Sequence, residues 1–404
     1  MRSTSADVIV LGGGLTGLSL AAALGSAGVE VAVLEQEDWQ ELLSAPYDGR
    51  VTAIARGPQL FLDAIGAWRD MAGAAEPIRD IVVHEAGSPV RVCYEGREID
   101  GKPLGWIVEN RAIRRALFER VTRLPTVRLQ SRAQVLAIER EATAATVTLA
   151  GGERLRGALL AVCEGRLSAT RERLGIPARR FPYRQTAIVC TLAHEKPHRG
   201  LAIERFFPDG PFALLPMQGH RSSIVWALEQ QRAEAVCLLE DAAFLAEVAE
   251  RFGDHLGEIA LEGPRWHYPL VLVMAERYTD HRVVLVGDTA RGIHPIAGQG
   301  WNLALRDVAA LAETLVDRLR LGLDPGDPLA LATYESWRRF DSLVLVAVTD
   351  GINRLFANEQ WWLGLVRNFG LLVVEQLPPL KRLFMRHAMG LLGELPRTMR
   401  GEPL

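Results

Sequence analysis

The chain has 404 residues, about half of them apolar, and a formal net charge of −3. This length exceeds the usual size of one domain, so two or more domains are expected. The nearly balanced charge, without a basic tail, argues against a nucleic-acid partner. The four cysteines show no metal-ligand spacing, so we expect free thiols in a reducing compartment and no metal site; they are Cys93, Cys163, Cys190 and Cys237.

The N-terminus predicts a nucleotide-binding unit. The apolar residues 6–11 indicate a strand and residues 18–24 a helix, and a Gly-x-Gly-x-x-Gly stands between them. Gly12 permits the turn, Gly14 lets a pyrophosphate approach the backbone, and Gly17 lets helix and strand pack closely. Phosphates then meet the unpaired N–H groups at the helix start.

A second strand, 29–34, ends at Glu35, about twenty residues after the glycine turn, where an acid can accept ribose hydroxyls. Strand, helix, second strand and acid in this order predict a dinucleotide site. They leave open which dinucleotide binds.

The middle of the chain predicts a β-rich insertion. A helix is expected near residues 59–62 and another over 111–124, and strands are expected at 81–85, 90–94, 127–130, 133–139, 146–150 and 155–163. Four further strands, at 185–193, 201–207, 212–216 and 222–228, precede a long amphipathic helical stretch over 229–252. A sheet with a helical cover is typical of a separate substrate domain.

A second glycine turn follows the strand at 282–286. Asp288 at the strand end can hold a ribose or ribityl hydroxyl, and Gly298-Gln299-Gly300 leads into a helix from Trp301 to Leu321. The helix start offers N–H groups and a positive dipole to an anion. This geometry suits the N1–C2=O edge of a reduced flavin better than a nicotinamide.

The stretch from Gly287 to Asp307, with its Gly-Asp and its His-Pro-Ile-Ala-Gly-Gln-Gly-Trp-Asn, resembles the flavin motif of class A flavoprotein monooxygenases. Residues 206–216, 349–356 and 377–382 are similar to segments of the ubiquinone-biosynthesis hydroxylases (UbiH/UbiF/VisC type). The resemblance covers nearly the whole chain. It implies an α/β fold like that of p-hydroxybenzoate hydroxylase, with a Rossmann-like FAD-binding domain of the GR2 type, an interleaved β-sheet substrate domain and C-terminal helices.

The recurrence of nucleotide-site features along the chain implies a discontinuous FAD-binding domain. We expect it to comprise residues 1–75, 100–180 and 277–335. The substrate domain would then comprise residues 76–99 and 181–276, and a C-terminal helical region residues 336–404.

The resemblance also implies the site residues. The FAD-binding residues would be Gly12, Gly14, Leu15, Thr16, Gly17, Glu35, Arg50, Asn110, Val135, Glu164, Asp288, Gly298, Gln299, Gly300 and Asn302. From the residues alone, the less favoured alternatives are a surface charge for Arg50 and a helix N-cap for Asn110. The candidate catalytic residues are His294 and Pro295, for which a rigid turn is the alternative.

The implied reaction is hydroxylation of the aromatic ring of a polyprenylated phenol in ubiquinone biosynthesis. NAD(P)H reduces FAD, O₂ adds at flavin C4a, and the hydroperoxide transfers hydroxyl to the ring, while the protein positions the ring and excludes water. Two alternatives stay open: a class A hydroxylase of a soluble aromatic compound, and a non-catalytic FAD-binding subunit. The second rests on two departures from the family pattern, Glu164 in place of aspartate and Arg291 in place of histidine.

The C-terminal region predicts a membrane-surface element. Apolar segments at 361–363, 371–374 and 383–385 alternate with basic residues, which suits a helix in a membrane interface; these are Arg367, Lys381, Arg382, Arg386 and Arg397. The alternative is a helical cover packed on the core or on a partner subunit.

With no signal peptide and no run of ~18–20 apolar residues, we expect a cytoplasmic protein, with the inner-membrane surface and ubiquinone-biosynthesis proteins as partners to consider.

Overall fold

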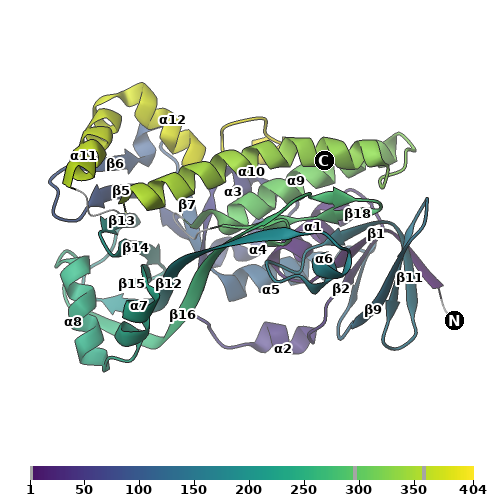
Figure 1. The fold of residues 1–404 in the computed structure, drawn as a ribbon, viewed down its shortest axis with the longest axis horizontal. Coiled ribbons are helices and arrows are strands. Elements are labelled where there is room, and N and C mark those ends of the chain that lie inside the picture. The colour runs from purple at the N-terminus through teal and green to yellow at the C-terminus, as the bar shows by residue number, and fades with distance from the viewer. Residues whose placement is uncertain (1–2, 294–297, 357–360) are drawn as a thin grey trace.

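The computed structural model describes residues 3–293, 298–356 and 361–404. These residues form two large sheets and a small one, with helices packed around them (Figure 1). Strands from the N-terminus, the middle and residues 279–285 share the first sheet, whereas residues 80–95 and most of 178–275 belong to the second. The chain therefore passes between the sheets several times, and the division into domains stays a prediction.

The first sheet has the N-terminal strand near its centre. β1 (Ser3–Leu11) pairs in parallel with β2 (Val31–Leu34) on one side and with β11 (Arg154–Val162) on the other. The other strands of this sheet are β8 (Val127–Gln130), β9 (Val135–Arg140), β10 (Ala145–Leu149), β17 (Thr279–Asp280) and β18 (Val283–Leu285). Residues 8–11 and 31–34 are buried. This burial is expected for apolar parallel strands that are covered on both faces.

Helix α1 (Leu15–Ser26) packs against two helices that come from distant parts of the chain, α5 (Asn110–Thr122) and α9 (Gln299–Arg320). Helix α10 (Pro328–Phe356) lies along α9 (Figure 1). Helix α9 begins two residues before the predicted Trp301, so the glycine turn is part of its first turn.

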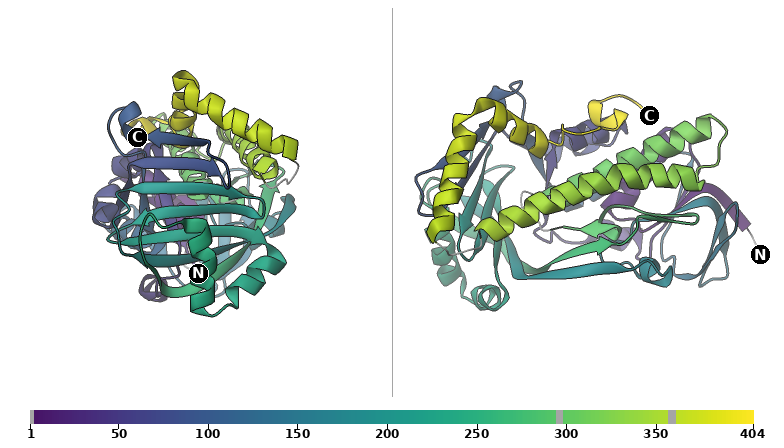
Figure 2. Two further views of the ribbon diagram at one scale, coloured as in Figure 1. Left: turned by 90° about the vertical axis from the view of Figure 1, so that its left-hand side faces the viewer. Right: turned by 45° about the horizontal axis from the view of Figure 1, so that its top comes forward.

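The second sheet has the strand order β19-β16-β12-β15-β14-β13-β5-β6. Its strands are β5 (Asp80–Glu85), β6 (Arg91–Glu95), β12 (Ala178–His194), β13 (Leu201–Phe207), β14 (Gly210–Met217), β15 (Arg221–Glu229), β16 (Ile259–Ala275) and β19 (Arg291–Gly292). Figure 2 shows these strands side by side, with α7 (Gln230–Cys237) and α8 (Asp241–Phe252) on one face. The predicted single helical stretch over 229–252 is wrong, because the chain leaves the helical conformation between Cys237 and Asp241; the amphipathic period continues across this break and so does not reveal it.

A small third sheet joins β3 (Val51–Ala55), β7 (Gly105–Glu109) and β4 (Glu76–Ile78). The remaining helices are α2 (Trp39–Ser44), α3 (Arg56–Ala64), α4 (Trp68–Met71), α6 (Ala169–Arg173), α11 (Trp361–Gln376) and α12 (Pro378–Ala388), with short 3₁₀ turns that include η3 (Gly287–Thr289). In the part of the chain that the structure describes, none of the helices is both long and apolar enough to cross a bilayer.

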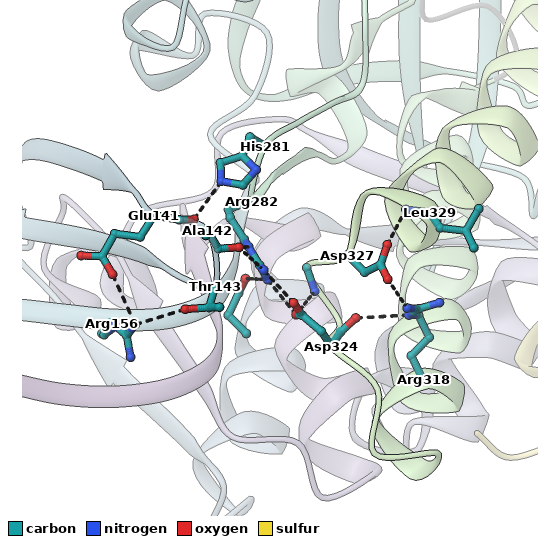
Figure 3. Close-up of polar contacts among 12 residues, drawn as sticks. Glu141, Ala142, Thr143, Arg156, His281, Arg282, Arg318, Asp324, Asp327 and Leu329 are labelled. Atoms are coloured by element: carbon teal, nitrogen blue, oxygen red, sulfur yellow. Dashed lines mark hydrogen bonds and ion pairs between the residues drawn. The ribbon is translucent and has the colours of Figure 1, made fainter.

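Arg282 braces the first sheet against the connection between α9 and α10 (Figure 3). Its guanidinium donates to the carbonyl oxygens of Ala142 and Ala158 and pairs with Asp324 (Nη2 to Oδ2, 2.6 Å). The hydrogen bond from Arg282 lowers the pKa of the Asp324 carboxyl. One buried side chain thereby ties together three segments that are far apart in the sequence.

Candidate functional site

The first glycine turn is tightly packed at two of its three glycines. Gly12 has a φ of +96°, and a Cβ there would lie 2.8 Å from the carbonyl oxygen of Cys163. A Cβ on Gly17 would overlap the carbonyl oxygen of Gly12. Gly14 differs: it has an ordinary φ of −68°, and among the described residues no atom lies within 4 Å of its ideal Cβ position. The protein itself therefore leaves space at the N-terminus of α1.

Glu35 lies directly beside this turn. Its carboxylate accepts hydrogen bonds from the backbone N–H groups of Gly13 (2.6 Å) and Glu37 (3.0 Å). The N–H of Ala133 donates to the Glu35 carbonyl, which brings Val135 to the same side of the sheet. The Val135 carbonyl accepts from Arg173 (2.9 Å). The structure thus brings the predicted adenosine-side residues together.

Glu164 also lies next to the first turn, but both of its carboxylate oxygens are occupied. They accept from the Ser168 hydroxyl (2.7 Å), the Thr170 hydroxyl (2.6 Å) and the Thr170 N–H (3.1 Å). These bonds hold the N-terminus of α6. Glutamate in place of the usual aspartate therefore serves to anchor this helix, and the prediction that it binds FAD stays untested.

The second strand end meets the first turn through η3. A Cβ on Gly287 would lie 3.0 Å from Thr16 and from Ala304 of α9. The Asp288 side chain is 38% exposed, yet burial raises the pKa of its carboxyl, against the lowering effect of Arg166 at 3.9 Å. The Asp288 carboxylate is therefore partly accessible after the end of β18, beside Arg166.

The start of α9 is fixed against β3. Gly298 precedes the helix with a φ of +63°, and a Cβ there would lie 3.1 Å from the Ala53 Cβ. Asn302 accepts from the Ala55 N–H (3.0 Å) and donates to the Ala53 carbonyl (2.8 Å). A Cβ on Gly300 would meet no described atom within 4 Å. This second helix start therefore also leaves space beside it, as at Gly14.

Arg50 and Asn110 are neighbours, and their contact with FAD stays a prediction. Asn110 donates its N–H to the Arg50 carbonyl (3.0 Å), and its side chain accepts from the Thr52 hydroxyl (2.7 Å). The alternative of a helix N-cap does not hold for Asn110, because Glu109 occupies that position of α5. The half-exposed Arg50 side chain pairs with Asp48 (Nε to Oδ2, 2.6 Å).

His294 and Pro295, the predicted catalytic residues, lie outside the described residues. Gln299 begins α9, but only its backbone is described. Within residues 3–293, 298–356 and 361–404, no three His, Cys, Asp or Glu side chains are grouped so that they could hold a metal ion.

A buried ion cluster beneath η3 escaped the sequence analysis. Asp307 accepts from Arg291 (2.7 Å) and Arg338 (2.8 Å) at one oxygen and from the Gly287 N–H (3.1 Å) at the other. The three side chains are at most 1% exposed. Arg291, the second departure from the family pattern, therefore supports the loop that carries Asp288. In the sequence, the only indication of this cluster was that charged residues occupy positions whose surroundings predict burial.

The contacts connect the two glycine turns: Gly13 touches Glu35, Thr16 touches Gly287, and Gly287 touches both Asp307 and Ala304 of α9. The open space at Gly14 and at Gly300 and the partly exposed Asp288 carboxylate belong to this connected set. These features fit an extended dinucleotide with a pyrophosphate and a ribityl chain. A metal ion or a short ligand would not need two open helix starts and a separate carboxylate.

Comparison with known proteins agrees with this geometry. The model of the FAD binding domain family matches residues 5–342. The chain is 50% identical over 402 residues to the ubiquinone hydroxylase UbiL of Rhodospirillum rubrum, covering 99% of this chain and 94% of that protein. It is 30% identical to the ubiquinone hydroxylase UbiM of Neisseria meningitidis, covering 96% and 85%. The crystal structure of p-nitrophenol 4-monooxygenase from Pseudomonas putida superposes with a TM-score of 0.79 at 19% identity, over 98% of this chain and 100% of that one.

Proposed function

The chain belongs to the FAD binding domain family, within the class A flavoprotein monooxygenases, and from this premise we propose that it hydroxylates the ring of a polyprenylated phenol in ubiquinone biosynthesis. The observation that carries the substrate class is the 50% identity to a ubiquinone hydroxylase over 99% of the chain. At this level of identity, the two proteins would share their whole architecture, including the sheet that would face the substrate.

The residues described above fit FAD. The start of α1 at Gly14 would receive the pyrophosphate, Glu35 the adenosine ribose, and Asp288 a ribityl hydroxyl. The start of α9, near Gly300, would face the flavin edge that becomes negative on reduction. Bound FAD would supply the redox chemistry, namely acceptance of a hydride from NAD(P)H and activation of O₂ for oxygen transfer to the ring. The chain's own residues position the ring and keep water out.

Removal of the gene tests this proposal. We expect the ubiquinone content of lipid extracts to fall and a less hydroxylated prenylphenol to accumulate, and the intact gene to restore both. Unchanged ubiquinone with no accumulating precursor would instead favour a soluble aromatic substrate. The purified protein provides the biochemical control, since it should bind FAD and oxidise NAD(P)H in either case.

We also propose that α10–α12 contact a membrane surface, from which a polyprenylated substrate can enter. Large apolar side chains are exposed along these helices: Phe340, Leu343, Val344, Phe369, Leu372, Leu377, Leu383 and Phe384. Two of the predicted basic residues do not face outward, because Arg367 pairs with Glu85 (2.5 Å) and Lys381 with Glu98 (3.0 Å). Arg382 and Arg386 remain exposed beside the apolar side chains, as membrane-surface helices require.

Replacing Phe369 and Phe384 together by serine is expected to reduce flotation of the protein with anionic phospholipid vesicles at least threefold, because both rings lose apolar contact with the lipid. Phe181 is similarly exposed, at 49%, and belongs to β12 of the second sheet rather than to these helices. Its replacement by serine should leave flotation unchanged. Equal flotation of both variants would show that the helices serve as a cover for a protein partner instead.

A further inference from the structure

Strand β13 directs alternate side chains to opposite sides of the second sheet. Ile203 and Phe207 pack into the core beneath α7 and α8, and Arg205 donates to the Arg251 carbonyl at the end of α8. Because strand side chains alternate, Ala202 and Glu204 lie on the other face. Glu204 therefore points away from the helical cover.

This other face leads directly to the start of α9. Ala202 packs in a cluster with Ile107 and Met217, against which Ala53 also packs. Ala53 is the residue whose carbonyl accepts from Asn302 and whose Cβ faces Gly298. The side of the sheet that carries Glu204 thus faces the second glycine turn, where the flavin ring would lie under the proposed function.

The surroundings of Glu204 are small and apolar. Its cross-strand neighbours are Val83 on β5 and Ala213 on β14, and Val225 follows Ala213 on β15. The Glu204 side chain is partly exposed, yet burial raises the pKa of its carboxyl to about 7, with no other cause. No hydrogen-bond or ion-pair partner occurs for this carboxylate among the described residues.

We propose that Glu204 is the proton acceptor for the phenolic hydroxyl of the substrate; this assignment rests on the proposed function. The phenolic O–H bond breaks, the proton moves to a carboxylate oxygen of Glu204, and the electron pair stays on the phenol oxygen. The resulting phenolate donates electron density to the ring positions that receive the oxygen atom. Glu204 then loses its proton to solvent, so the net proton balance is unchanged. The Glu204 carboxylate has no partner side chain, so it does not stabilise the fold through an ion pair. A general base works best when its pKa lies near the operating pH.

The other ionisable groups on the strands around this face either pair with other charged residues or lie elsewhere in the strand register than Glu204. Glu85 on β5 pairs with Arg367 of α11, and Glu109 on β7 pairs with Arg111 (2.6 Å) and Arg221 (3.5 Å). On β6, burial raises the pKa of Tyr94 to about 12, so it stays neutral. The other groups of β5, β6 and β13 lie in register on the helical face; they are Asp80, His84, Arg91, Cys93, Glu95 and Arg205. Glu76 on β4 and Glu229 on β15 remain. None of them adds to the causes that set the pKa of Glu204.

The test compares Glu204→Gln with Glu229→Gln, an exposed glutamate at the end of β15 in the same sheet. The FAD-loaded proteins are supplied with NAD(P)H, O₂ and an ortho-prenylated phenol of one isoprene unit, and product formation is followed as a function of pH. The resting complex should hold the neutral phenol, because the charged carboxylate disfavours a second negative charge beside it. In wild type and Glu229→Gln, product formation should rise with pH as the Glu204 carboxyl ionises. Glu204→Gln should lose this rise, still oxidise NAD(P)H, and form product about 10²–10⁴ times more slowly with release of H₂O₂.

Glu204→Asp keeps the carboxylate on a shorter side chain and should restore part of the pH-dependent product formation. A Glu204→Gln protein with the wild-type pH profile and coupled hydroxylation would overturn the assignment. If wild type hydroxylates a simple phenol with a Glu204-dependent pH profile but hydroxylates no prenylphenol, the proposed function fails while the role of Glu204 stands. If Glu204→Gln does not bind FAD, the comparison of Glu204→Asp with wild type decides.

Discussion

Asp307→Asn is expected to lower the free energy of unfolding by about 3–5 kcal/mol, because it leaves two buried guanidinium groups without their shared carboxylate. Arg291 and Arg338 both donate to one Asp307 oxygen, and all three side chains are at most 1% exposed. Urea unfolding followed by circular dichroism measures the change. The matched control is Asp317→Asn on the same helix, whose half-exposed pair with Arg397 should contribute less than about 1 kcal/mol.

The same cluster sets a pH dependence. Burial would raise the pKa of the Asp307 carboxyl, but the charges of Arg291 and Arg338 and their hydrogen bonds lower it below its ordinary value of 3.8. A lowered folded-state pKa contributes stability that is present above the unfolded-state pKa and is lost as the pH falls through the folded-state pKa. Wild type should therefore lose more stability than Asp307→Asn below about pH 4. Parallel acid-unfolding curves for the two proteins would contradict this account of the cluster.

Gly17→Ala and Gly14→Ala are expected to fail in different ways, although both lie in one glycine turn. The Gly17→Ala methyl would overlap the Gly12 carbonyl, and Gly12 cannot retreat because it already lies against Cys163. Overlap of backbone with backbone should cost more than about 3 kcal/mol and leave little folded protein. The Gly14→Ala methyl meets no described atom, and its backbone angles suit alanine. Its stability should stay within about 0.5 kcal/mol of wild type.

Gly14→Ala should instead weaken FAD binding at least tenfold, because its methyl group fills the space through which the pyrophosphate reaches the start of α1. Fluorescence titration of the flavin-free protein with FAD measures the affinity, and a thermal melt confirms the fold. Wild-type affinity in a folded Gly14→Ala protein would mean that the pyrophosphate does not approach α1 at this residue.

Local patterns in the sequence predicted much of this structure. The glycine spacing indicated the packing that Gly12 and Gly17 show, and the strand expected at 201–207 has those bounds. The family resemblance supplied the cofactor and the fold. These features depend on neighbouring residues or on motifs, so a linear sequence displays them directly.

Pairings between distant segments could not be predicted in the same way. Nothing near Arg291 shows that it shares the Asp307 carboxylate with Arg338, and Glu204 looks like an ordinary polar residue of a strand until the register reveals its neighbours. The role of Glu164 was more accessible, because Ser168 and Thr170 follow at helix-capping distance. Buried charges reveal their purpose only when the tertiary contacts are known.

The position of β1 at the centre of the first sheet also affects biosynthesis. Its parallel partner β11 begins at residue 154, and α9, which packs on α1, ends at residue 320. At about 5–20 residues per second, the ribosome delivers β11 roughly 7–30 s after β1. During that interval the apolar strand β1 lacks its partner β11, and α9 is synthesised later still. The nascent chain must therefore be kept from aggregation until the C-terminal third emerges. Truncated chains that end before α9 should therefore depend on chaperones rather than form a stable nucleotide-binding unit.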